Sequence, residues 1–141
     1  MKYVLLVSHG TFAPGLKNAL GMLLGEREDL LAVSLENGMG ADQFAGRVEA
    51  VLPRLGKEDE LILFADIVGG SPLTTAANVI GQNGILEQTT MVGGMNLPLV
   101  LSAMLSKDTA DTKSLLETWI GESREQMKVF QVEAETSEED I

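Results

Sequence analysis

The sequence of 141 residues contains no cysteine and a single histidine. Without cysteine the chain can form neither a disulfide framework nor a thiolate nucleophile, and one histidine cannot supply the several ligands that metal catalysis usually requires. No apolar run reaches the roughly 18 to 20 residues of a membrane-spanning helix, and no signal-peptide cleavage pattern follows the N-terminus. We therefore expect a cytoplasmic protein that uses no metal or other cofactor and does not insert into the membrane.

Positive charge is also scarce. The chain has 10 Lys and Arg against 21 Asp and Glu, a net charge of −11, so its surface should repel the phosphates of nucleic acid. Five of the acidic residues lie in residues 133–141 without a basic residue among them. We interpret this segment as an acidic, disordered tail, and residues 1–132 as one domain, because one core is expected at this length.

Apolar runs alternate along the chain with amphipathic segments. The runs predict strands at residues 3–7, 31–35, 60–65 and 89–92, and a short late strand at 129–132. Helical spacing of apolar residues predicts helices at 16–25, 41–55, 73–84, 97–105 and 109–121. The alternation predicts an α/β fold, a mostly parallel doubly wound sheet with helices on both faces.

Two ionisable residues follow strands that should be neighbours. His9 lies two residues beyond the predicted strand 3–7, and Asp66 directly follows strand 60–65. In open α/β sheets, ligands bind at the carboxyl ends of the strands where the strand order reverses. A carboxylate that accepts a hydrogen bond from one imidazole nitrogen leaves the other nitrogen free as a base or nucleophile. We expect these side chains to meet.

The motif Gly69-Gly70-Ser71-Pro72 predicts a helix start, with Ser71 as N-cap and Pro72 in the first turn. The free N–H groups of such a start suit an anion such as phosphate. The same residues can also serve only to start a helix, and His9 can be a structural histidine. A Ser71–His9–Asp66 triad, a hydrolase or acyltransferase with Ser71 as nucleophile, also stays open. The common phosphate-loop and hydrolase-elbow motifs are absent.

Three stretches, VSHGTFAPGL, ADIVGGSPLTTAAN and GGMNLPLVL, resemble in this order the EIIA components of the mannose/fructose/sorbose family of the sugar phosphotransferase system (PTS). The resemblance implies that His9 accepts a phosphoryl group from the carrier protein HPr and passes it to an EIIB component, here expected on a separate chain. It further implies that Asp66 orients the imidazole and that Ser71 lies beside the phosphoryl group. We place the remaining phosphate- or partner-binding positions in the same motifs, at Gly10, Thr11, Phe12, Gly69, Gly70, Asn96, Leu97 and Pro98.

The family's fold implies a homodimer in which the late strand, here residues 129–132, crosses to the partner subunit. A related alternative is a non-catalytic phosphohistidine module of the kind found in dihydroxyacetone kinase, although Gly10-Thr11-Phe12-Ala13 fits the sugar family better. We expect Asp66 to favour the tautomer protonated on Nδ1, so that Nε2 attacks phosphorus. The apolar stretches 12–14 and 97–99 are candidate docking surfaces, or they are buried.

Overall fold

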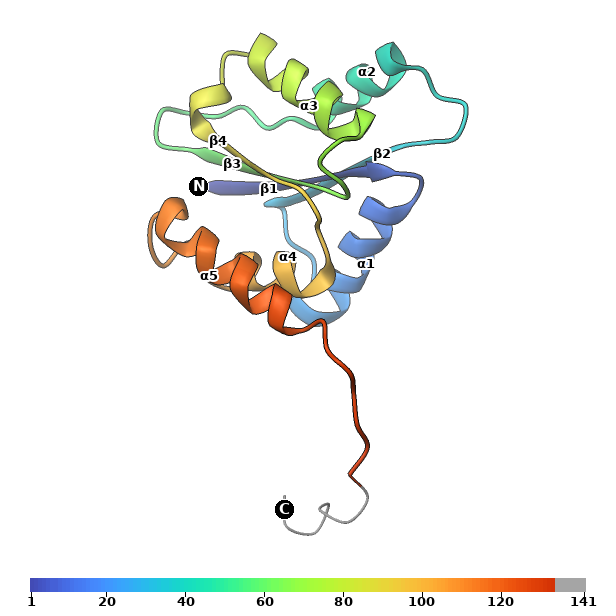
Figure 1. Ribbon diagram of the computed structural model, residues 1–141. Helices are drawn as coiled ribbons and strands as arrows, with labels where there is room; N and C mark the ends of the chain where they lie inside the picture. The colour runs from blue at the N-terminus through green and yellow to red at the C-terminus, as the bar shows by residue number, and fades with distance from the viewer. Residues whose placement is uncertain (134–141) are drawn as a thin grey trace.

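A parallel sheet forms the centre of the molecule, and layers of helices cover both of its faces (Figure 1). The computed structural model describes residues 1–133. Its strands are β1 (Lys2–His9), β2 (Leu30–Leu35), β3 (Glu60–Ala65) and β4 (Thr89–Val92), in the spatial order β2-β1-β3-β4. Every neighbouring pair is parallel. The predicted α/β fold is therefore confirmed.

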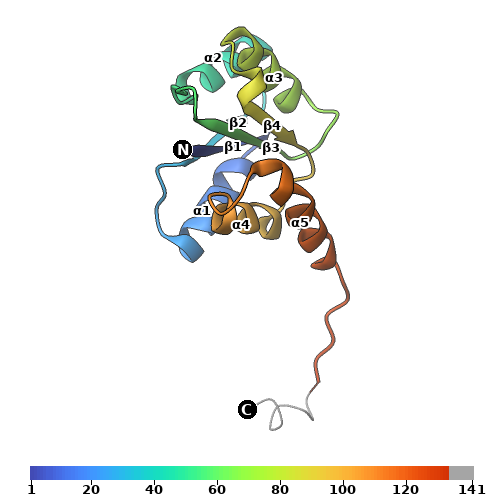
Figure 2. The same cartoon turned by 90° about the vertical axis from the view of Figure 1, so that its left-hand side faces the viewer.

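The helices divide between the two faces (Figure 2). One face carries α1 (Phe12–Leu24), α4 (Leu97–Ser106) and α5 (Thr112–Glu125), and the other carries α2 (Ala41–Val51) and α3 (Ser71–Gln82), with a 3₁₀ turn η1 (Leu86–Gln88) before β4. Side chains alternate along β1, so that Val4 and Leu6 enter the first core and Leu5 and Val7 the second. Both faces of the central strands are buried, which explains why the sequences of these strands are continuous apolar runs.

Several predicted boundaries were wrong by a few residues. Strand β1 continues through His9, and α1 and α3 begin earlier than the apolar spacing indicates, at Phe12 and Ser71. Helix α2 ends at Val51 because Leu52 is extended, as expected of a residue that precedes proline. Helix α5 runs on to Glu125. The earlier starts of α1 and α3 bring both helix N-termini to the edge of the sheet where β1 and β3 end.

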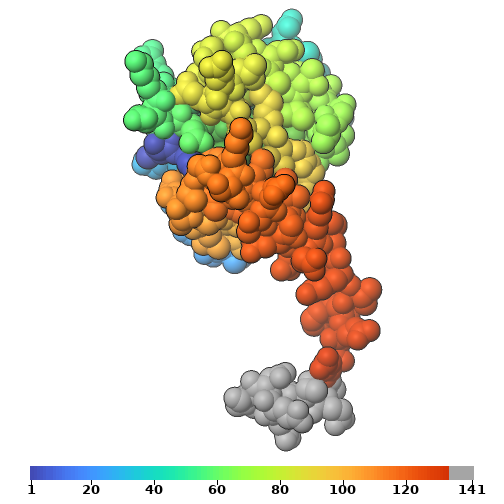
Figure 3. All heavy atoms as spheres, turned by 60° about the vertical axis from the view of Figure 1, so that its left-hand side comes forward, coloured from blue at the N-terminus to red at the C-terminus, as the bar shows by residue number. Residues whose placement is uncertain are grey.

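The predicted late strand is the main difference. Residues 127–133 form neither helix nor strand and lead away from α5 (Figures 1 and 3). Their apolar side chains Val129, Phe130 and Val132 are more than 80% exposed. A strand needs a partner for its backbone hydrogen bonds, and a single chain offers none at this place. Except for Glu133, the predicted acidic tail lies outside the described residues.

Residues 1–133 contain no helix that is long and apolar enough to cross a membrane.

Candidate functional site

His9 and Asp66 lie together at the carboxyl edge of the sheet, because β1 and β3 are neighbours and pair as far as Val7 and Ala65. Oxygen Oδ2 of Asp66 lies 2.8 Å from Nδ1 of His9 and accepts a hydrogen bond of 2.9 Å from the His9 backbone N–H. Oxygen Oδ1 accepts from the backbone N–H of Ile67 at 2.9 Å. Both carboxylate oxygens are therefore engaged, and the two side chains meet as the strand order predicts.

The charge of Asp66 decides which nitrogen of His9 carries a proton. Partial burial of Asp66 raises the pKa of its carboxyl, but the hydrogen bonds from the His9 backbone, the His9 ring and Ile67 outweigh burial and hold the pKa below its ordinary value of 3.8. Asp66 is thus ionised at neutral pH and can only accept. In a neutral imidazole, the proton then lies on Nδ1 and the free lone pair on Nε2. The His9 side chain is 49% exposed, so this lone pair can reach a second molecule.

Ser8 positions the turn that follows β1. It is fully buried, and its hydroxyl accepts a hydrogen bond of 2.6 Å from the backbone N–H of Ala13, one of the free donors at the start of α1. Gly10 adopts the left-handed conformation with φ of 55° and donates to the Leu35 carbonyl. Our sequence reasoning missed Ser8. The available signal was a hydroxyl at the end of an apolar strand, a few residues before a helix.

The second motif brings a helix start to the His9 ring. Gly70, not Ser71, is the N-cap of α3, so the predicted cap was wrong by one residue. Gly70 is buried in the extended region, with φ of −100°, and a Cβ atom placed on it would lie 2.7 Å from Cε1 of His9. Glycine is required here by space and not by backbone angle. Ser71 is exposed and makes no side-chain hydrogen bond within the described residues, so no hydrogen bond joins its hydroxyl to His9.

The third motif does not join this cluster. Asn96 caps α4: its Oδ1 accepts from the Leu99 backbone N–H at 3.0 Å, and its Nδ2 donates to the Gly94 carbonyl at 3.2 Å. Leu97 and Pro98 are partly buried and line a groove between α4 and α5. No hydrogen bond links these three residues with His9 within residues 1–133, and their predicted role in phosphate or partner binding stays a prediction.

The candidate docking stretches are only partly exposed. In the first, Phe12 and Pro14 are exposed, whereas Ala13 is fully buried. In the second, Leu99 is 2% exposed and belongs to the core. Thr11, Phe12 and Gly69 remain exposed near the ends of β1 and β3. The exposed surface around His9 is therefore made mainly by the first two motifs.

Comparison with known protein families matches residues 3–120 to EIIA-man, described as the PTS system fructose IIA component. The chain belongs to the EIIA-man family. A Bacillus subtilis relative, the PTS fructose-specific EIIA component, is 29% identical over 126 residues, which are 89% of this chain and 84% of the relative. The mannose-specific EIIAB component of Escherichia coli K12 is 25% identical over 105 residues, 74% of this chain but only 32% of that longer protein.

A solved structure supports the fold of this EIIA-man chain. The mannose/sorbose-specific IIA subunit from Enterococcus faecalis superposes with a TM-score of 0.78 at 24% identity, over 94% of this chain and 98% of that one. The two structures therefore agree in the arrangement of the sheet and its helices. The parallel sheet whose carboxyl edge carries His9 is therefore the architecture of an EIIA subunit.

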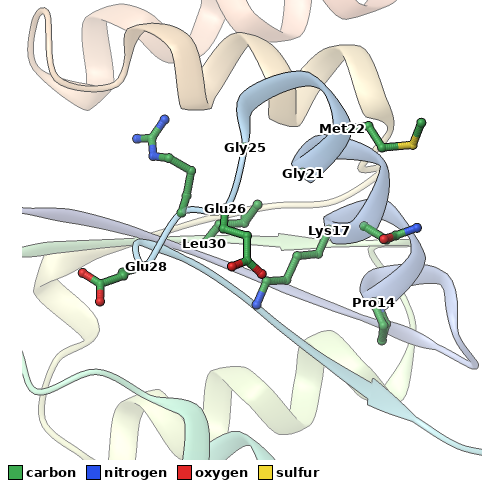
Figure 4. A pocket seen from close by; sticks show the side chains of 10 residues that line it. Pro14, Lys17, Gly21, Met22, Gly25, Glu26, Glu28 and Leu30 are labelled. Atoms are coloured by element: carbon green, nitrogen blue, oxygen red, sulfur yellow. The ribbon is translucent and has the colours of Figure 1, made fainter.

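A pocket on this EIIA-man fold, shown in Figure 4, is not lined by His9. It has a volume of about 610 Å³ and is formed by α1 and the loop to β2, with Lys17, Met22 and Arg27 among its lining residues. None of the predicted site residues lines it. Within residues 1–133, no three His, Cys, Asp or Glu side chains gather in a way that could hold a metal ion. The His9 site is thus an open surface site, which suits a macromolecular partner better than a small substrate that must be enclosed.

Proposed function

We propose that this protein is a phosphoryl carrier in the cytoplasm, which accepts a phosphoryl group from HPr on His9 and passes it to an EIIB component. The observation that carries the proposal is the geometry of His9, whose Nδ1 faces the ionised Asp66 while Nε2 points away from that contact on a half-exposed ring. Membership of the EIIA-man family supports the same role.

The proposed transfer needs no group beyond the two proteins. The Nε2 lone pair of His9 attacks the phosphorus of a donor phosphohistidine, a new phosphorus–nitrogen bond forms, and the donor's bond breaks with its electron pair returning to the donor imidazole. The His9 ring becomes cationic, and the Asp66 carboxylate stabilises that charge. In the onward step, a nucleophile of EIIB attacks the phosphorus and His9 leaves as a neutral imidazole.

The N-terminus of α3 is suited to bind the phosphoryl oxygens. Gly70 touches the His9 ring, and the backbone N–H groups of Ser71 and Leu73 that follow have no acceptor within the helix. These donors and the positive end of the helix dipole suit a developing phosphoryl charge. The proposal includes Gly69 and Ser71, which flank Gly70, among the residues that bind the phosphoryl group. Phe12 and Ile67, 48% and 53% exposed, provide apolar surface beside it for a docking protein.

The direct test is transfer from the donor. We expect that incubation with phosphoenolpyruvate, enzyme I and HPr adds one phosphoryl group to His9, labile in acid and stable in base, detected by intact-mass and peptide mass spectrometry. His9→Gln should accept none. Ser71→Ala should still accept phosphate on His9, because Ser71 is not the nucleophile. A phosphoryl group found on Ser71 of the wild-type protein would favour the hydrolase or acyltransferase. Absence of transfer from HPr would contradict the proposal. Phosphate that enters but never reaches EIIB would indicate a regulatory module.

We also propose a homodimer in which residues 129–132 pair with the sheet of the partner subunit. Strand β4 is an edge strand, and the apolar side chains of the departing segment are exposed in the single chain. Light scattering should give twice the chain mass for the full protein and for a variant that lacks residues 134–141. Deletion of residues 127–141 should give a monomer. A full-length monomer at micromolar concentration would refute the dimer.

A further inference from the structure

The loop Asp66–Gly70 is held between two glycine contacts. At its end, Gly70 lies against the His9 ring, as described above. At its middle, Val68 packs against Gly93, in the turn between β4 and α4: a Cβ atom on Gly93 would lie 2.3 Å from Cγ2 of Val68 and 3.3 Å from its Cα and N. Gly93 belongs to the third sequence motif, whose other residues the proposed function leaves without a role at His9.

The requirement for glycine at position 93 is one of space. Its φ lies outside the left-handed region, in contrast with that of Gly94, which is 73°. Alanine could therefore adopt the backbone angles of residue 93. Its methyl group could not fit, because a contact of 2.3 Å is far inside the ordinary distance between carbon atoms, and the neighbouring backbone of Val68 is close as well.

The loop, and not the turn, has room to yield to such a methyl group. Val92 pairs with Phe64 in the sheet on one side of Gly93, and on the other the backbone N–H of Met95 donates to the Ala65 carbonyl at 2.9 Å. The turn is thus anchored to β3 on both sides. Val68, in contrast, is 72% exposed and Ile67 53%, so the loop can move outward into solvent.

A movement of the loop changes the surroundings of His9, because residues at both ends of the loop contact the imidazole. Asp66 holds Nδ1 and the backbone N–H of His9, and Gly70 lies against Cε1, the ring atom between the two nitrogens. A shift of Val68 displaces residues that contact the imidazole on two sides. Position 93 can therefore act on the orientation of the ring through the loop.

We propose that Gly93 is a positioning residue for His9. Because position 93 has no side chain, the Asp66–Gly70 loop can pack closely against the β4–α4 turn, and in this position the loop holds the imidazole in the orientation for attack through Nε2. The consequence for transfer rests on the proposed phosphoryl carrier function. The orientation of the ring is measured independently of it, because His9 is the only histidine of the chain and its imidazole ¹⁵N signals need no assignment.

The test compares Gly93→Ala with Gly81→Ala, a matched control at an exposed position of helix α3 where a Cβ atom meets nothing within 4 Å. Two-bond ¹H–¹⁵N spectra should show the Nδ1-protonated tautomer in the wild type and in Gly81→Ala. In Gly93→Ala the tautomers should be mixed, and transfer from HPr should fall about 100-fold, the loss typical of a misplacement of about 1 Å. Val68→Ala in the Gly93→Ala background removes the 2.3 Å contact and should restore the wild-type imidazole signals.

Each outcome of this test either supports or contradicts the inference on Gly93. Gly93→Ala with a lowered melting temperature but wild-type His9 signals would overturn the inference, since Gly93 would then have a purely structural role. If Gly93→Ala does not fold, the double variant takes its place, and imidazole signals in it that differ from those of Val68→Ala alone would count against the mechanism. If wild-type protein accepts no phosphate while the tautomer still responds to position 93, the proposed function fails and the positioning role stands.

Discussion

Asparagine in place of Asp66 should slow phosphoryl transfer to His9 by about 100-fold or more, within the range expected when the group that fixes a catalytic imidazole is lost. The reason lies in the three donors around the carboxylate. Oδ2 faces the backbone N–H and Nδ1 of His9, and Oδ1 faces the backbone N–H of Ile67. A carboxylate can accept all three hydrogen bonds, whereas an amide offers only one acceptor oxygen.

Either orientation of the asparagine amide leaves a conflict. If its NH₂ group faces Ile67, two donors oppose each other. If it faces His9, the NH₂ group opposes the backbone N–H and favours an unprotonated Nδ1, which places the ring proton on Nε2 and removes the attacking lone pair. Both orientations also lose the negative charge that, in the proposed transfer, stabilises the phosphorylated ring.

Single-turnover transfer from phosphorylated HPr would measure the effect, together with the imidazole ¹⁵N signals of the only histidine. Asp42→Asn is the control, because Asp42 is an exposed carboxylate in the first turn of α2. The variant should transfer at the wild-type rate. An Asp66→Asn protein that accepts phosphate as fast as the wild type, with the same tautomer, would remove Asp66 from the mechanism.

The contact between His9 and Asp66 could be predicted because it depends on strand order alone. Continuous apolar runs indicated buried parallel strands, and neighbouring parallel strands bring their carboxyl ends to one edge. The register of β1 and β3, in which Val7 pairs with Ala65, brings the end of β1 with His9 to the same edge as Asp66.

Other features of the site depend on contacts between segments that are distant in the sequence. The contact of Gly93 with Val68 follows from packing distances that no local pattern encodes, whereas the hydroxyl of Ser8, which accepts from Ala13 in α1, left only a weak local signal. Helix starts were misplaced for a related reason: the apolar spacing marks where a helix touches the core, whereas its first turn, with N–H groups that have no partner in the helix, can begin ahead of that spacing. Asn96, predicted to bind phosphate or a partner, has a local role as well, because its side chain caps α4.

Removal of the Asp29 side chain should have the largest effect on stability, because it leaves a buried cation without its main partner. Lys107, 1% exposed at the end of α4, lies 2.8 Å from Asp29 and 3.2 Å from the exposed Asp108. Arg27 also donates two hydrogen bonds to the Asp29 carboxylate, at 3.1 and 2.8 Å. Asp29→Ala should lower the free energy of unfolding by about 3 to 5 kcal/mol, the usual loss when one partner of a buried ion pair is removed.

Lys107→Met provides the matched comparison, since it removes the buried cation together with its need for a partner and leaves Asp29 paired with Arg27. We expect a smaller loss for this variant, and the double variant Asp29→Ala/Lys107→Met should be more stable than Asp29→Ala alone. Urea denaturation at neutral pH measures all three. Equal losses for the two single variants, or a double variant no better than Asp29→Ala, would mean that the buried charge of Lys107 is not the cause.

The pH dependence gives an independent check of the same pair. Burial raises the pKa of the Asp29 carboxyl, but hydrogen bonds and charge from Arg27 and Lys107 outweigh burial, so the pKa lies below the ordinary value of 3.8. A carboxyl with a lowered pKa in the folded state stabilises the fold fully above its unfolded pKa, and this contribution disappears as the pH falls from about 3.8 through the folded pKa. The difference in unfolding free energy between the wild type and Asp29→Asn should therefore be constant between pH 6 and 8 and shrink below about pH 4. A difference that stays constant down to pH 2 would show that Asp29 contributes through packing and not through its charge.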